Sequence, residues 1–220
     1  MSKQILVIGA GRFGSAVALT LAGAGHEVVV ADVNEASLHP VMDEVAHAAV
    51  LDATDEEALR QLGAGNFDTI VIGIGTNFEA SILATVAAKA AGGERVVAKA
   101  TSAIAARVLL RVGADEVIRP EHDMGVRLAH QIATPSLVDA FRLGDDYEVV
   151  EIEVGEEEML HGSLADLRLP NEYGVQVMAV TRESGLKVSP GAQFQVQRGD
   201  RLVVIGSVDA VRKFEGALGR

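Results

Sequence analysis

Apolar and polar positions alternate in a regular rhythm from residue 4 to about residue 133. Short apolar runs that suit buried strands lie at Ile5–Ile8, Glu27–Ala31, Ala48–Leu51, Thr69–Ile74, Arg95–Ala98 and Glu116–Ile118. Stretches with helical composition or spacing follow them at Ser15–Ala24, Glu35–Asp43, Glu56–Leu62, Glu79–Ala91, Ala103–Val112 and Asp123–Ile132. This strand–helix repetition predicts βαβ units, and right-handed crossovers then favour an α/β domain with a doubly wound parallel sheet.

The rhythm breaks near Thr134-Pro135, which predicts a second, smaller domain. We expect a further helix over Pro135–Leu143 and a polar hinge at Gly144-Asp145-Asp146. Beyond the hinge, alternating or apolar runs predict strands and a final helix at Glu148–Val154, Val175–Thr181, Leu186–Val188, Leu202–Ile205 and Val208–Leu218. The expected organisation is a first domain over 1–134, a crossover helix and linker over 135–146, and a small α+β domain over 147–220.

Composition narrows the classes of function. The 220 residues include no Cys, which excludes disulfides, thiolate metal sites and a Cys nucleophile, and is consistent with a reducing cytoplasm. A net charge of −12 weighs against nucleic acid as a partner, because phosphate neutralisation needs a basic face. Residues Met1–Gln4 do not resemble a signal peptide, and the longest stretch without charge or His, Phe13–Gly25, is too short to span a bilayer. We expect a chain with no direct membrane insertion.

A glycine-rich turn directly follows the first predicted strand. The segment reads Gly9-Ala10-Gly11-Arg12-Phe13-Gly14, and helix-like residues come after it. Gly9 permits a tight turn, Gly11 lets the backbone approach phosphate, and Gly14 lets the helix pack close to the strand. Asp32 ends the second predicted strand about 20 residues further on, where a carboxylate accepts hydrogen bonds from ribose hydroxyls and repels a 2′-phosphate. The pattern predicts a Rossmann-type adenine nucleotide site and disfavours NADP; a turn that has lost its ligand is the alternative.

Arg12 lies within this turn and adds information about the phosphates. Its guanidinium can pair bidentately with a phosphate, and a terminal phosphate carries more charge to neutralise than the pyrophosphate of a dinucleotide. The alternative is a solvated arginine at a helix start, where the helix dipole disfavours it slightly. We predict a phosphate contact for Arg12.

Five segments together resemble the regulatory proteins of Trk/Ktr potassium uptake systems, which carry an RCK (regulator of potassium conductance) or TrkA-N domain followed by a small TrkA-C domain. The segments are Gly9–Gly14, Ala31-Asp32-Val33-Asn34, Leu51-Asp52-Ala53-Thr54-Asp55, Ile74-Gly75-Thr76-Asn77 and Arg119-Pro120-Glu121-His122-Asp123-Met124-Gly125. The resemblance covers essentially the whole chain in order. The last segment and the Asp-Ala-Thr tripeptide are more specific than the glycine turn.

The resemblance implies a cytoplasmic nucleotide sensor, peripheral at the inner face of the cell membrane. Family members form homo-oligomers in which dimers assemble to an octameric ring on a potassium-translocating membrane subunit, and they bind ATP or ADP, or in some members NAD(H). Exchange of the nucleotide changes the shape of the ring and so gates the pore. The nucleotide contacts that carry over by resemblance are Gly9, Arg12, Phe13, Gly14, Asp32, Asn34, Asp52, Ala53, Thr54, Thr76 and Lys99. Arg12 matches the position that reaches the terminal phosphate, in its own site or in that of a neighbouring subunit.

Several of these positions keep a second interpretation. Asp52 to Asp55 form a good helix start in which Thr54 is the expected cap, and their place at a strand end also lets them flank an adenine. Lys99 is either a solvated lysine at a strand end or a cation near the nucleotide. Glu121 resembles the family position that binds Mg²⁺ or Ca²⁺ at a subunit interface, yet Pro120-Glu121 is also ordinary chemistry for a first helical turn. A single carboxylate is a weak metal site unless a symmetry mate adds another.

The second domain of several relatives binds cyclic di-AMP across a dimer interface. Those relatives place an arginine toward the phosphates where this chain has Pro170, although Arg168 is close by. The departure favours a plain dimerisation domain.

An NAD-dependent Rossmann oxidoreductase is the alternative function. Such an enzyme needs a catalytic acid–base and a substrate pocket beside the nicotinamide. The sequence has no GxSxG elbow and no P-loop, and its histidines are scattered at His26, His39, His47, His122, His130 and His161. A redox-sensing transcriptional repressor would need a DNA-binding module and a basic face. We therefore expect no enzymatic activity, and the choice between ATP/ADP and NAD(H) stays open.

Overall fold

The first of two compact units is built on a six-stranded parallel sheet. The computed structural model describes residues 2–133, 137–144, 146–155, 160 and 162–218, and the chain divides into Met1–His122 and Asp123–Arg220. The strands of the first unit are β1 Gln4–Ile8, β2 Glu27–Asp32, β3 His47–Val50, β4 Thr69–Ile72, β5 Val96–Lys99 and β6 Glu116–Ile118. Their order, β3-β2-β1-β4-β5-β6, is that of the dinucleotide-binding fold, in which ligands lie where the strand order reverses beside β1. The prediction of a doubly wound parallel sheet is confirmed.

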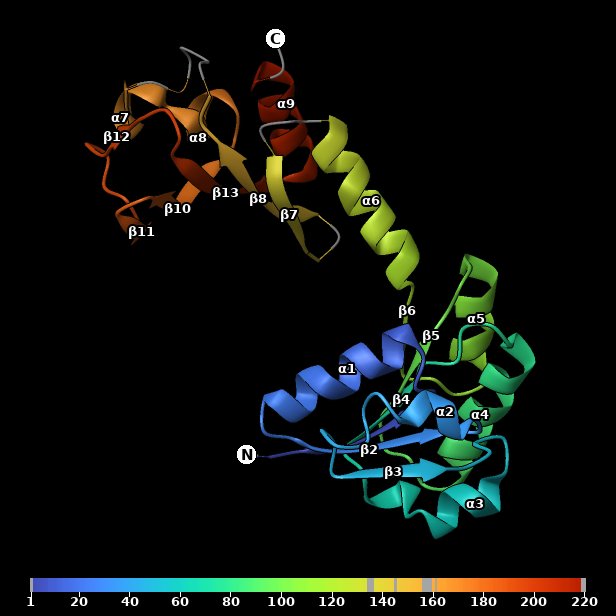
Figure 1. Ribbon diagram of the computed structural model, residues 1–220. Helices are drawn as coiled ribbons and strands as arrows, with labels where there is room; N and C mark the ends of the chain where they lie inside the picture. Colours follow the sequence, from blue (N-terminus) through green and yellow to red (C-terminus); the bar gives the residue numbers. More distant parts are fainter. Residues whose placement is uncertain (1, 134–136, 145, 156–159, 161, 219–220) are drawn as a thin grey trace. The chain divides into compact units, whose positions relative to one another are not determined.

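Helices cover both faces of this sheet (Figure 1). They are α1 Arg12–Gly23, α2 Glu35–Leu38, α3 Glu56–Gln61, α4 Phe78–Ala90 and α5 Ala103–Arg111, with a 3-10 turn at Ala64–Asn66. Successive strand residues point to opposite faces. Leu6 and Ile8 of β1 therefore pack with α3, α4 and α5, whereas Ile5 and Val7 pack with α1 and α2. This two-sided burial explains why the strands read as continuous apolar runs.

The second unit contains a five-stranded antiparallel sheet. Helix α6 Pro120–Ala133 begins at the end of the first unit and continues into the second. The sheet has the order β11-β10-β13-β8-β7, with strands at Leu137–Leu143 (β7), Tyr147–Glu153 (β8), Gln176–Arg182 (β10), Gly185–Val188 (β11) and Arg201–Ser207 (β13). The short strands β9 Gly162–Ser163 and β12 Gln195–Val196 pair with each other, and the remaining helices are α7 Leu164–Leu167, α8 Leu169–Glu172 and α9 Val208–Leu218. Over the residues described, neither unit has a helix that is long and apolar enough to cross a membrane.

The structure differs from two of the predicted helices: one of them is a strand where the structure describes it, and the other is shorter. From Leu137 to Leu143 the chain forms strand β7, antiparallel to β8 with Phe141 opposite Val149; residues 134–136 lie outside the described part. Pairing with a strand beyond the turn outweighs local helix propensity. The helix expected over Glu35–Asp43 ends at Leu38, because Pro40 has no N–H with which to continue the helical hydrogen bonds.

Candidate nucleotide-binding site

The residues predicted to contact a nucleotide follow the carboxyl ends of five neighbouring strands. Gly9 to Gly14 follow β1; Asp32 ends β2 and Asn34 comes after it; Asp52, Ala53 and Thr54 follow β3; Thr76 follows β4; and Lys99 ends β5. Carboxyl ends of parallel strands meet at the same edge of a sheet, which is where ligands of such folds bind. The fold therefore gathers all of these positions along one edge, and Glu121, just after β6, extends the row.

Two positions of the glycine-rich turn require glycine. Gly9 has a φ of +94°, in the region that side chains disfavour, and a Cβ on Gly14 would lie 1.9 Å from the carbonyl oxygen of Gly9. Gly11 differs, because nothing lies within 4 Å of the place of its Cβ. It is the N-cap residue of α1 and has no side chain to cap the helix. The space beside the start of α1 at Gly11 is thus open, and the first amides of a helix have no partner within the helix, as a phosphate site needs.

Asp32, at the end of the neighbouring strand β2, forms a hydrogen bond with the glycine-rich turn. Its Oδ2 accepts a hydrogen bond from the Ala10 N–H at 2.7 Å, and its Oδ1 accepts one from the Asn34 N–H at 2.8 Å. The Asn34 side chain in turn accepts from the Ala36 N–H and caps α2. A carboxylate offers about four acceptor positions, so about two remain at Asp32 for ribose hydroxyls.

Asp52 and Thr54 form a small hydrogen-bonded turn after β3. The hydroxyl and the N–H of Thr54 both donate to Asp52 Oδ1, at 2.7 and 2.9 Å, and these bonds lower the pKa of the Asp52 carboxyl. The expectation that Thr54 caps the next helix is wrong. Asp55 is the cap of α3 and accepts from the Glu57 N–H at 2.9 Å, because its side chain, one residue later, reaches the first free amides. Ala53, the residue between Asp52 and Thr54 in the sequence, is buried.

Lys99 is largely shielded from solvent rather than solvated at the strand end. Its side chain is only 11% exposed, its Nζ lies 2.5 Å from Glu121 Oε1, and it lies 5.7 Å from the centre of the Phe13 ring. A Cβ on Gly75 would come within 3.1 Å of the same Nζ, so the lysine lies close beside the loop that follows β4. The lysine is thus a cation against the glycine-rich turn.

The hydrogen bond from Lys99 is the main reason that the pKa of Glu121 is lowered, and the charge of the exposed Arg12 contributes in the same direction. Sequence reasoning considered both Lys99 and Glu121 but missed their pairing. The signal was present, because one ends β5 and the other follows β6, its neighbour in the sheet.

A resident metal finds little support in the geometry. Within the part of the chain that the structure describes, His, Asp and Glu side chains form no group of three that would hold a metal ion. Glu121 offers one carboxylate, already engaged by Lys99. Divalent-cation binding at Glu121 stays a prediction, which needs a second subunit to add ligands.

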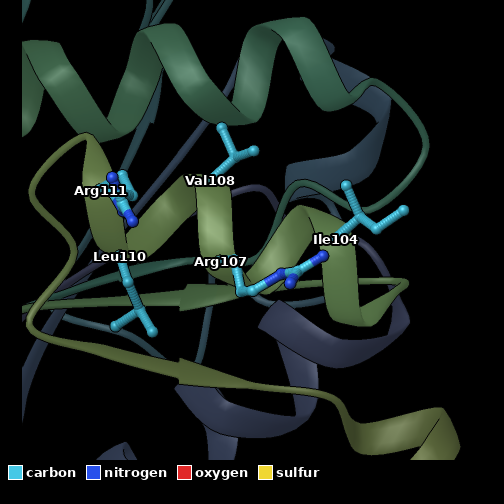
Figure 2. A pocket seen from close by; sticks show the side chains of 5 residues that line it. All are labelled: Ile104, Arg107, Val108, Leu110 and Arg111. Atoms are coloured by element: carbon cyan, nitrogen blue, oxygen red, sulfur yellow. The ribbon is translucent and has the colours of Figure 1, made fainter.

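Two features lie outside this edge. A hollow on α5 is lined by Ile104, Arg107, Val108, Leu110 and Arg111, all from that one helix (Figure 2). In the second unit, Pro170 lies in the first turn of α8, and Arg168 before it has a φ of +45°. Neither feature involves the residues predicted to contact the nucleotide.

The first unit has the strand order and the glycine-rich turn of Rossmann-type nucleotide-binding domains, followed in the same chain by a small α+β unit. Residues 5–120 match the TrkA-N domain and residues 149–219 match the TrkA-C domain. The chain belongs to the family of Trk/Ktr potassium uptake proteins that these two domains define, as the sequence resemblance predicted.

Two relatives cover nearly the whole chain. It is 36% identical to the Ktr system potassium uptake protein C of Bacillus subtilis (strain 168), over 98% of this chain and 97% of the relative. It is 37% identical to the Ktr system potassium uptake protein A of Vibrio alginolyticus, over 94% of each. The solved structure of the GsuK channel bound to NAD has a TM-score of 0.69 at 14% identity and covers all of this chain but 40% of that chain. At 14% identity, this structural similarity supports the assignment of the fold.

Proposed function

We propose that this chain is a nucleotide-sensing regulatory subunit that gates a potassium-translocating membrane subunit. The observation that carries the proposal is the gathering of the turn amides, Asp32, Asp52 and Lys99 at one edge of the sheet, next to the open space at Gly11. The near-full-length similarity to Ktr system potassium uptake proteins supports the class of partner.

The strand order suggests how a nucleotide lies along this edge. Asp32 ends β2 and Asp52 follows β3 on one side of β1, and Lys99 ends β5 on the other. Ribose and adenine then lie over β2 and β3, the first phosphate at the start of α1, and further phosphates toward β4 and β5. Arg12, exposed at the first residue of α1, is available to a terminal phosphate of its own site or of a neighbouring subunit. This arrangement favours ATP/ADP, with NAD(H) as the other candidate.

Two of the six histidines lie away from the candidate site. His26 and His47 lie at the amino ends of β2 and β3, on the edge of the sheet opposite the glycine-rich turn. An acid–base catalyst has to reach the bound nicotinamide and its substrate. We propose that the nucleotide is bound and exchanged without being turned over.

Exposed apolar side chains favour assembly into a homo-oligomer. Leu83 and Val86 of α4 and Ile104 and Leu110 of α5 are each 45–66% exposed, and Met124 and Leu128 of α6 are 58% and 54% exposed. Apolar surface of this kind marks interaction sites. We propose an octamer assembled from dimers, cytoplasmic and held at the inner face of the membrane by its potassium-translocating partner.

The experiment is a comparison of nucleotide binding, turnover and ion flux. We expect ATP, ADP or NADH to raise the melting temperature without sustained consumption, and ATP and ADP to give different rubidium uptake in vesicles that hold the chain with a Ktr-type membrane subunit. Light scattering should give an octamer. A strict monomer at micromolar concentration, or sustained NADH oxidation with a small substrate, would contradict the proposal.

Arg12→Ala tests whether the site distinguishes the number of phosphates. The variant should lose discrimination between ATP and ADP while ADP binding falls less, because the guanidinium contacts the terminal phosphate. Arg95→Ala is the matched control, since Arg95 precedes β5 at the opposite edge and pairs with Glu116. Equal losses of ATP and ADP affinity in Arg12→Ala would show that Arg12 has no terminal-phosphate role.

A further inference from the structure

A buried hydroxyl group lies near the start of α4 in the first unit. The Ser81 side chain is 2% exposed, and its Oγ forms no hydrogen bond with any residue that the structure describes. Buried polar groups are nearly always hydrogen-bonded, because leaving one without a partner is unfavourable. The Ser81 hydroxyl therefore calls for a state of the chain in which it is paired.

Thr85, one turn later on the same buried face of α4, is satisfied within the helix. Its Oγ1 donates to the carbonyl oxygen of Ser81 at 2.7 Å. The equivalent acceptor for Ser81 is the carbonyl oxygen of Asn77, which accepts from the Ser81 N–H at 3.1 Å but not from its hydroxyl. The helix thus offers Ser81 the kind of acceptor that Thr85 uses, and the hydroxyl does not take it.

Ser81 lies where α4 meets the loop that follows β4. A helical side chain covers the turn before its own Cα. The Ser81 hydroxyl therefore lies at the first turn of α4, next to the loop of residues 73–77 that leads into this helix. Backbone groups of this loop are the partners that a small rearrangement would bring to the hydroxyl.

The same loop borders the candidate nucleotide site at two places. A Cβ on Gly73 would lie 3.2 Å from the carbonyl oxygen of Gly9, so the loop runs against the glycine-rich turn. A Cβ on Gly75 would lie 3.1 Å from Lys99 Nζ. Thr76, between Gly75 and the start of α4, is one of the predicted nucleotide contacts. A nucleotide bound along this edge therefore acts on the loop.

We propose, on the basis of the nucleotide site proposed above, that Ser81 is a positioning residue for the bound nucleotide. When the nucleotide binds, residues 73–77 move, and one of their backbone groups pairs with the Ser81 hydroxyl. This hydrogen bond exists only in the complex. It holds the loop in its ligand-bound arrangement, so Ser81 adds to nucleotide affinity without touching the ligand.

The nucleotide affinity of Ser81→Ala in the full chain tests the proposal. ADP and ATP should each bind about threefold to tenfold more weakly, the loss expected for one hydrogen bond of the complex. The melting temperature of the nucleotide-free variant should equal or exceed that of the unmodified chain, because no hydrogen bond is lost there. Alanine also has the higher helix propensity, but this gain is the same with and without nucleotide and cancels from the affinity.

Thr85→Val is the matched control. It removes the other buried hydroxyl from the same face of α4 and nearly keeps the shape of the side chain. Its hydrogen bond is present without nucleotide, so the melting temperature of Thr85→Val should fall while its affinity for ADP and ATP stays unchanged.

Crystal structures of the unmodified chain with and without ADP give a direct check. The Ser81 Oγ should lie within hydrogen-bonding distance of a backbone group of residues 73–77 only when ADP is bound. The same partner in both structures would contradict the proposal.

Two results of the binding and melting measurements would overturn the role of Ser81 and leave the nucleotide site in place. One is equal affinity of Ser81→Ala and the unmodified chain for ADP and ATP. The other is a lower melting temperature of nucleotide-free Ser81→Ala, which would show that the hydroxyl is already paired, for example with a buried water. Failure of ATP, ADP and NADH alike to bind the unmodified chain would overturn the proposed function as well.

Discussion

Gly11 and Gly14 belong to the same turn but are constrained by different things. At Gly14 the carbonyl oxygen of Gly9 already occupies the space that a side chain would need, so the constraint comes from the fold. At Gly11 the space is open and the backbone has an ordinary φ of −72°, so the fold does not require glycine there. A ligand phosphate that approaches the amides of α1 does require the absence of a side chain.

Gly14→Ala should destabilise the first unit by about 2–3 kcal/mol, because its methyl group meets backbone that has no room to move. Gly11→Ala should stay within about 1 kcal/mol of the unmodified chain yet bind ADP and ATP more weakly. Urea unfolding followed by circular dichroism, with nucleotide titration of the folded variants, measures both effects. Equal destabilisation by the two substitutions would show that packing, and not the ligand, accounts for both glycines.

At the scale of elements, side-chain caps mark where three helices of the first unit begin. Asp55, Asn77 and Ser102 each accept a hydrogen bond from a free amide at the start of α3, α4 and α5. Each follows a strand closely, so the helix starts just beyond the edge where the site lies. The caps thus stabilise the helices and also fix the ends of the loops that carry Asp52, Thr76 and Lys99.

Asp55→Ala should cost about 1 kcal/mol of the free energy of unfolding, the usual loss for a removed cap. Thr54→Ala should cost less than about 0.5 kcal/mol, because its hydroxyl bonds only to the exposed Asp52. It should also raise the pKa of Asp52, since that hydrogen bond is the largest cause of the lowering. Chemical denaturation of both variants and NMR titration of Asp52 check this, and a larger loss for Thr54→Ala would restore Thr54 as the cap.

At the scale of the whole molecule, each unit has its own buried core. In the second unit, Val211 and Phe214 of α9 pack with Leu202 and Val204 of β13. The ion pair of Arg182 and Asp200 lies beside this core, with Arg182 over the ring of Phe194. Asp200 is 1% exposed and accepts from Arg182 at 2.6 and 2.7 Å and from the Gln197 N–H at 2.8 Å. Burial raises the pKa of Asp200, but the hydrogen bonds and charge of Arg182, together with that N–H, outweigh burial and lower it overall.

Asp200→Asn should destabilise the second unit by about 2 kcal/mol at pH 7, because it removes one charge of a buried, hydrogen-bonded pair. The folded pKa of Asp200 lies below its unfolded value of about 3.8, so its contribution is present above that pH and is lost as pH falls through the folded pKa. The difference between variant and unmodified chain should shrink in this acid range. Amide hydrogen exchange of residues 175–205, recorded for both chains over a range of pH, measures this difference in stability.

Nucleotide affinity should not change in Asp200→Asn, since the site lies in the other unit. Glu56→Gln is the control for ion pairs. It removes the exposed pair with Arg60 and should cost less than about 0.5 kcal/mol at every pH. A pH-independent difference for Asp200→Asn would contradict the role of its charge.

The amino-acid sequence by itself determined the parallel sheet, the place of the glycine-rich turn and the edge on which Asp32, Asp52 and Lys99 gather. These follow from local signals: a strand buried on both faces is apolar throughout, and a tight turn before a helix needs glycine. The carboxyl ends of parallel strands share one edge of the sheet. The predicted strands therefore also indicate where the candidate site lies.

Only the tertiary structure decided which residues pair. The stretch from Leu137 to Leu143 is a strand because β8 supplies its hydrogen-bond partners from beyond the turn. Asp32, on another strand, accepts a hydrogen bond from the Ala10 N–H. The side chain of Lys99 is largely shielded from solvent and forms an ion pair with Glu121. Hydrogen bonding and desolvation depend on groups that are distant along the chain, which local patterns of polar and apolar residues do not encode.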